Sequence, residues 1–166
     1  MRLYASDFHL SFLRDAAKLV DSRIREIEFE AKRGDPELVE HLYDSAEYLY
    51  GFGLVACQQF ISVCTAECTL SPKEALQLGP DHQCGASIVS LVNALANRWK
   101  HEAGWGKRPT PNESRTIATL SRLGLKREDS YFTANALAIL LRPHTPRIQR
   151  IVPFLRQWNH TLRNAA

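Results

Sequence analysis

The chain has 166 residues, of which 45% are hydrophobic and 23% are charged, and its formal net charge is +3. This is ordinary globular composition and gives no indication of an intrinsically disordered chain. A chain of this length buries enough apolar surface to fold without a disulfide or a metal ion, so we expect residues 1–166 to form a single domain.

Two long helices are predicted at the start of the chain. The first begins at Ser6 or Asp7, which are both good N-cap residues, and ends at Gly34. The second begins at Pro36, because proline suits the first position of a helix, and continues to about Cys68. Apolar residues at three- and four-residue steps are expected to form the buried side of the first helix. They are Phe8, Phe12, Ala16, Leu19, Ile24, Ile27 and Ala31.

The later part of the second helix is expected to be the buried centre of the fold. Residues 49–66 are apolar on nearly every side, which is typical of an internal helix. Gly51 and Gly53 in this stretch either permit close contact between helices or mark a bend. Gln58 and Gln59 follow, and at least one of these amides should be buried, either as a partner of the polar residues on the next helix or as plain packing.

Shorter helices are predicted in the rest of the chain. No segment has the alternating pattern of a strand, so the predicted fold class is all-α, a bundle of about five or six helices in which the first three dominate. The predicted positions are a short helix from Ser71, helices at Gly85–His101, from Asn112 and at Ser130–Leu141, and a last helix from Thr145 with a kink at Pro153.

A cytoplasmic protein is expected. Charged residues interrupt the first twenty positions, which removes the apolar core that a secretory signal needs. The most apolar stretch, residues 51–66, is shorter than a transmembrane helix and contains two glutamines, so no membrane partner is expected. In the cytoplasm the four cysteines would be reduced thiols.

Charge is distributed unevenly along the chain. Residues 1–90 carry 8 basic and 14 acidic side chains, whereas residues 91–166 carry 13 basic and 4 acidic ones. An anionic partner for the C-terminal half, such as nucleic acid, would explain this asymmetry. Packing of an acidic half against a basic half would explain it equally well.

A dense polar cluster closes the helix predicted at residues 85–101. Asn93, Asn97 and His101 are spaced i, i+4 and i+8 and therefore share one face. Arg98 lies three residues before His101, so we expect both side chains to reach one point in an open cleft. In a metal-independent ribonuclease, a base takes the proton of the ribose 2′-hydroxyl and a cation stabilises the phosphate. Arg98 and His101 are the predicted catalytic pair. The predicted nucleic-acid-binding residues are Asn93, Asn97, Lys100, Lys107 and Arg108.

A long first helix, a mostly buried second helix and the ending Asn97-Arg98-x-x-His101 resemble the HEPN superfamily over roughly residues 7–105. The resemblance implies a helical-bundle protein that binds RNA as a homodimer, needs no cofactor, and is an endoribonuclease of a toxin–antitoxin or phage-defence system. The family places more residues between its Arg and His than the two found here. HEPN-like domains with altered motifs can be inactive binding modules. The alternative is therefore a non-catalytic interaction protein that binds a protein partner, such as an antitoxin, an immunity factor or a regulatory subunit.

Four residues of types that bind zinc occur in the middle of the chain. Cys64 and Cys68 are one helical turn apart, and His82 and Cys84 follow in the next loop. Their spacing matches no common zinc module, and cysteine is also a common core residue. No metal site is predicted from them, and zinc binding stays an open alternative.

The last helix carries a group of basic residues. They form either a stripe that contacts RNA phosphates or an ordinary basic surface. The group consists of Arg142, Arg147, Arg150, Arg156, His160 and Arg163.

Overall fold

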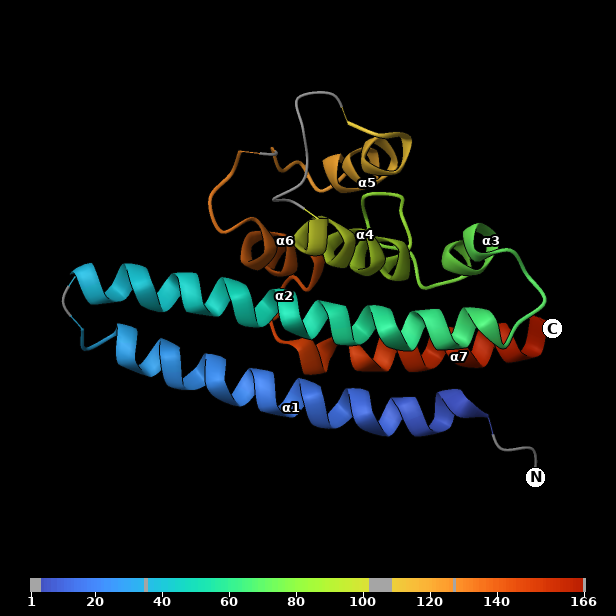
Figure 1. Ribbon diagram of the computed structural model, residues 1–166, viewed down its shortest axis with the longest axis horizontal. Coiled ribbons are helices and arrows are strands. Elements are labelled where there is room, and N and C mark those ends of the chain that lie inside the picture. The colour runs from blue at the N-terminus through green and yellow to red at the C-terminus, as the bar shows by residue number, and fades with distance from the viewer. Residues whose placement is uncertain (1–3, 35, 102–108, 127, 166) are drawn as a thin grey trace.

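In the part of the chain that the computed structural model describes, all regular elements are helices, and the all-α class is confirmed (Figure 1). The structure describes residues 4–34, 36–101, 109–126 and 128–165. Within these ranges there are seven α-helices and one 3₁₀ helix, compared with the five or six helices predicted. They are α1 (Ala5–Ala31), α2 (Pro36–Ala66), α3 (Pro72–Gln77), α4 (Ile88–His101), α5 (Pro111–Ser121), α6 (Phe132–Leu140), η2 (Ile148–Arg150) and α7 (Val152–Ala165).

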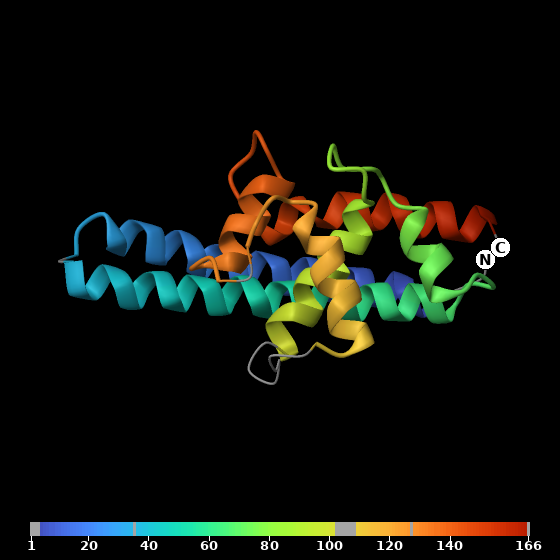
Figure 2. The same cartoon turned by 90° about the horizontal axis from the view of Figure 1, so that it is seen from above.

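The helices are arranged around the long antiparallel pair of α1 and α2. Helix α7 runs along this pair, antiparallel to α1, so the start of α1 and the end of α7 lie at the same end of the molecule (Figures 1 and 2). Helices α4 and α6 pack on α2, and α5 packs on α4 (Figure 2). This arrangement sets α4, which carries the polar cluster, between the central helix α2 and the outer helix α5.

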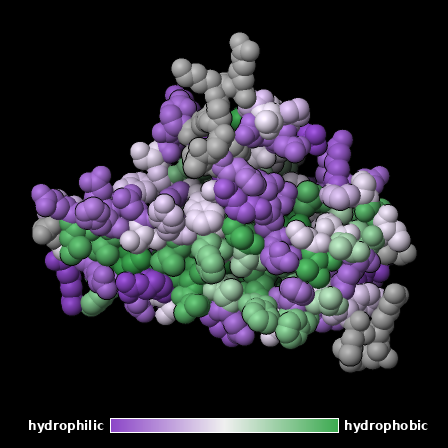
Figure 3. Space-filling model, in the orientation of Figure 1, coloured by the Kyte–Doolittle hydropathy of each residue, from purple (hydrophilic) through white to green (hydrophobic). Residues whose placement is uncertain are grey.

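The buried side of α1 differs from the predicted one. Ile24 and Ile27 are buried as expected, but Phe8, Phe12 and Leu19 are 66%, 64% and 71% exposed. The prediction placed these three residues in the core because of their three- and four-residue spacing, but the helix turns a neighbouring row of apolar residues inward instead. The buried apolar residues of α1 are Leu13, Ala17, Val20, Ile24 and Ile27. Figure 3 shows apolar side chains along the exposed side of α1 and α2.

Helix α2 is continuous through its two central glycines, which permit close contact rather than a bend. A Cβ atom on Gly51 would lie 2.0 Å from the indole nitrogen of Trp99 in α4. A Cβ atom on Gly53 would lie 2.5 Å from Ile148 in η2. The absence of side chains at these two positions therefore lets two other elements approach the backbone of α2.

By length and composition, α2 could also cross a membrane. Half of its most apolar 18-residue window is buried inside the protein, and core helices of soluble proteins pass the same test of length and composition. This helix does not decide where the protein resides, and the cytoplasmic location stays a prediction.

At the start of three helical elements, backbone N–H groups donate to a carboxylate from a distant part of the chain. Glu67 accepts hydrogen bonds from the backbone N–H groups of the first two residues of α1 (2.6 and 3.3 Å). Glu47 does the same at Thr133 and Ala134 of α6 (2.6 and 2.9 Å). Asp21 does so at the first two residues of η2 (2.8 and 2.9 Å). Carboxylates satisfy N–H groups that a helix itself leaves unpaired, so these acidic residues of the N-terminal half hold helices in place.

The predicted boundaries of the other helices hold in some places and shift in others. The capping box of Ser71 and Glu74 at α3 is confirmed. Helix α5 is capped by Thr110 rather than by Asn112. Pro153 is the second residue of α7, where the missing N–H breaks no helical hydrogen bond, so the predicted kink is wrong. Likewise, the N-cap of α1 is Tyr4, not Ser6 or Asp7.

Candidate functional site

Helix α4 presents the predicted polar cluster on one side and the core on the other. The hydroxyl of Ser87 accepts a hydrogen bond from the backbone N–H of Ser90 (3.0 Å) and so caps the start of the helix. Asn93 and Asn97 are half-buried, and His101 at the last position of the helix is exposed. The three residues line one groove, as their spacing predicted.

Gln58 of α2 orients Asn93 and Asn97 through hydrogen bonds to their side chains. Its side chain is 8% exposed, and its amide nitrogen donates to Oδ1 of Asn93 (2.9 Å) and to Oδ1 of Asn97 (2.7 Å). Of the two interpretations that the sequence left open for a buried glutamine, the structure shows the hydrogen bond to this cluster rather than plain packing. Because both amide oxygens face Gln58, the two Nδ2 groups remain as donors for another partner.

The groove lies between α3, α4 and α5 and has a volume of about 960 Å³. Lys73, Arg115 and Arg122 line it together with His101. The acidic residue of the lining, Glu113, accepts a hydrogen bond from the backbone N–H of Thr110 (2.5 Å) in the cap of α5. The described lining therefore combines three cations with one carboxylate that is already hydrogen-bonded.

Arg98 does not share this groove with His101. Its side chain is only 4% exposed, and its guanidinium carbon lies 3.7 Å from the centre of the Phe132 ring in α6. The expectation that Arg98 and His101 meet in an open cleft is wrong. Arg98 follows Leu91 and Leu95 at a four- and a three-residue step, so it lies on the buried side of α4, where its cation stacks on an aromatic face.

Comparison of the chain with protein-family models, with curated proteins and with solved structures gives no match. The resemblance to the HEPN superfamily is therefore neither supported nor contradicted by a relative. Any function has to be argued from the groove and its side chains.

The structure does not place the other predicted binding residues, Lys100, Lys107 and Arg108, in the lining of the groove. Lys100 is exposed but is not part of the lining. Lys107 and Arg108 lie outside the described residues. Arg115 and Arg122 were not among the predicted binding residues, although their i and i+7 spacing places them on one side of α5 and its C-cap. Neither was singled out because no motif joins them to α4.

The four potential zinc ligands do not form a cluster. Within the described residues, no group of three or more His, Cys, Asp or Glu side chains could hold a metal ion. Cys64 is buried, and burial raises the pKa of its thiol to about 12. Cys64 therefore packs as a core residue, which is a common structural role of cysteine.

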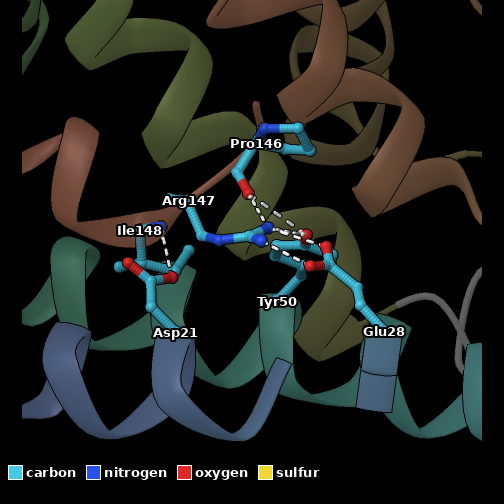
Figure 4. A network of polar contacts seen from close by, with 6 residues as sticks. All are labelled: Asp21, Glu28, Tyr50, Pro146, Arg147 and Ile148. Atoms are coloured by element: carbon cyan, nitrogen blue, oxygen red, sulfur yellow. Dashed lines mark hydrogen bonds and ion pairs between the residues drawn. The ribbon is translucent and has the colours of Figure 1, made fainter. Parts of the chain in front are cut away.

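The basic group of the last helix is divided between two roles. Arg163 pairs with Asp7 of α1 (2.7 Å), and Arg147 pairs with Glu28 of α1 (Figure 4). These contacts tie the basic C-terminal part to the acidic first helix and account for part of the charge asymmetry. Arg156 and His160 make no ion pair with described residues and line a different pocket.

Proposed function

We propose that this chain binds single-stranded RNA in the groove between α3, α4 and α5. The observation that supports this most directly is the position of Gln58, which engages the amide oxygens of Asn93 and Asn97 and leaves their N–H donors for a ligand. A surface of donors suits a ligand rich in acceptors, such as phosphate oxygens and the carbonyl groups of bases.

The charged lining fits the same ligand. Lys73, Arg115 and Arg122 are suited to contact phosphate groups, because Arg presents a fork of donors and Lys a compact charge. The asparagines can then hydrogen-bond the edges of unpaired bases, which are accessible in single strands and not in duplex RNA. Phosphate contacts would supply most of the affinity and make it dependent on salt.

His101 gives the groove a group that can transfer protons, and we include metal-independent cleavage in the proposal. The imidazole would take the proton of a ribose 2′-hydroxyl, and the 2′-oxygen would attack the adjacent phosphorus. The bond to the 5′-oxygen would break and that oxygen would take a proton from water, giving a 2′,3′-cyclic phosphate and a 5′-hydroxyl end, and the imidazolium would return its proton to the solvent. Because Arg98 is stacked on Phe132, the charge of the phosphate would be stabilised by Arg115 or Lys73 instead.

RNA binding is tested by fluorescence anisotropy with a labelled single-stranded oligoribonucleotide at several salt concentrations. Arg115→Ala should weaken binding several-fold and reduce the slope of affinity against salt by about 1. Gln58→Leu should also weaken binding, because it removes the group that orients both asparagines. Arg25→Ala removes the same charge from an exposed position of α1 outside the groove, and it should bind as the unchanged protein does.

Cleavage is tested with the same RNA in the presence of EDTA. His101→Ala should abolish product formation, whereas His41→Ala, an exposed histidine of α2, should retain it. Equal cleavage by both variants would remove His101 from the mechanism. RNA binding without cleavage would favour the inactive binding module, and the absence of both would favour a protein-interaction role. The homodimer that the HEPN resemblance implies is tested by the mass of the protein in solution.

A further inference from the structure

A second pocket lies between α1 and α7, away from the groove. The two antiparallel helices are tied together at both ends (Figures 1 and 2). At one end Arg163 pairs with Asp7 (2.7 Å), and at the other Asp21 accepts the backbone N–H groups of Ile148 and Gln149. Between these ties the helices leave a pocket of about 690 Å³. Its volume falls in the range of small-molecule sites.

Two helical rows of side chains face each other across this pocket. Arg14 and Lys18 are one turn apart on α1. Arg156 and His160 are one turn apart on α7, and both belong to the row that begins at Val152. The described lining therefore contains three permanent cations and a histidine, and it includes no Asp or Glu.

The charges of this pocket are largely uncompensated by the protein. Arg14 and Arg156 form no ion pair with any residue in the described part of the chain. Lys18 contacts Asp15 at 3.4 Å, but this pair is exposed on both sides and contributes little. Asp7 and Asp21, the acidic residues of α1 at the two ends, are already engaged. Cations gathered in this way attract an anion.

His160 and two apolar residues of the lining, Val152 and Pro153, indicate which kind of anion the pocket would bind. The amide nitrogen of Asn164 donates to Nδ1 of His160 (3.1 Å), which leaves the ring proton on Nε2 as a further donor. Val152 and Pro153 supply apolar surface within the same pocket. A ligand that matches both features carries an anionic group on an apolar body.

We propose that this pocket binds a phosphomonoester with an apolar body. A phosphate dianion balances several cations where a carboxylate would balance one, and its oxygens match the donor forks of two arginines. The pocket shares no lining residue with the RNA groove, so the proposal stands independently of RNA binding.

The proposal is tested by titration calorimetry of the purified full chain with three probes: adenosine 5′-monophosphate, n-octyl phosphate and inorganic phosphate. At least one organic phosphate should bind more tightly than inorganic phosphate, because only the organic probes contact the apolar floor. If adenosine 5′-monophosphate binds more tightly than n-octyl phosphate, the apolar body of the ligand is planar. The reverse order indicates an aliphatic body. Failure of all three probes to bind at millimolar concentration would overturn the proposal.

Variants locate the binding. Arg14→Ala and Arg156→Ala should each weaken the better probe about tenfold or more, since each removes a charge-assisted contact. Arg156→Lys should lose less affinity than Arg156→Ala, because lysine keeps the positive charge but lacks the paired N–H donors of a guanidinium. Arg25→Ala, which removes an exposed cation of α1 outside the pocket, should change nothing. Equal losses in Arg25→Ala, or loss of RNA binding in place of phosphate binding, would contradict a separate site.

Discussion

Both terminal nitrogens of Arg147 donate to the carboxylate of Glu28, 119 residues earlier in the chain (2.9 and 2.5 Å; Figure 4). Arg147 is largely buried, with 15% of its side chain exposed, and it also donates to the carbonyl oxygen of Pro146 (2.7 Å). The hydroxyl of Tyr50 donates to the same carbonyl (3.2 Å). The segment before η2 is therefore fixed to both α1 and α2 by charged and polar contacts.

Removing Arg147 should destabilise the protein measurably. Arg147→Ala leaves Glu28 without its partner, and hydrogen bonds to charged groups imply a loss of about 2 kcal/mol. Urea unfolding followed by circular dichroism measures the change. Arg150→Ala serves as the control, because Arg150 is exposed and its loss should cost under about 0.5 kcal/mol. Equal effects of the two variants would show that the bidentate contact contributes little.

Asp21 should be more sensitive than any exposed carboxylate of α1. It is fully buried, and its two oxygens satisfy the N–H groups at the start of η2. Asp21→Ala would leave both N–H donors without this partner, and because the donor of Ile148 is buried we expect a cost of about 3 kcal/mol. Asp15→Ala, at an exposed position earlier in the same helix, should change the free energy of unfolding by under about 0.5 kcal/mol. Chemical denaturation of the two variants distinguishes these cases.

Much of the fold could be predicted because helix positions depend on neighbouring residues. Pro36 marks the start of α2, and Ser71 with Glu74 marks α3, since a cap acts within one turn of its helix. The side of a helix that becomes buried depends on its distant partners instead. Phe8 and Phe12 have the spacing of core residues, yet no described helix covers them.

The candidate site was only partly predictable for the same reason. The shared face of Asn93, Asn97 and His101 follows from helical spacing alone. The burial of Arg98 depends on Phe132, which reaches it from α6. Arginine is usually a surface residue, so the spacing along α4 alone does not predict that Arg98 stacks on a ring of another helix. Similarly, nothing in the local sequence of Glu47 or Glu67 indicates that they cap other helices.

Tyr50 should titrate at unusually high pH. Burial raises the pKa of its phenol from 10.0 to about 12, and the nearby charge of Arg147 offsets this only in part. Because the folded-state pKa lies above the unfolded value, the associated stability is complete below about pH 10 and is lost as the pH rises toward 12. Tyrosinate absorbance should show a group that titrates near pH 12 and is missing in Tyr50→Phe. A late group that persists in this variant would assign the effect to another tyrosine.

Gly51 should tolerate no larger residue while Trp99 is present. In most helices Gly→Ala is stabilising by about 1 kcal/mol, because alanine has the higher helix propensity. Here the added methyl group would lie 2.0 Å from the indole nitrogen of Trp99, so the indole must move from its position on α2. Overpacking of this kind costs about 1–3 kcal/mol, and Gly51→Ala should therefore lower the midpoint of thermal unfolding.

The background variant Trp99→Ala separates the two effects of this substitution. Without the indole the methyl group has room, so Gly51→Ala in that background should raise stability through its helix propensity. A reversal of sign between the two backgrounds measures the contact between α2 and α4 directly. If Gly51→Ala is destabilising by the same amount in both, the glycine is needed for a reason other than Trp99. Because α4 carries Asn93, Asn97 and His101, Gly51→Ala should also weaken RNA binding if RNA binds in the groove.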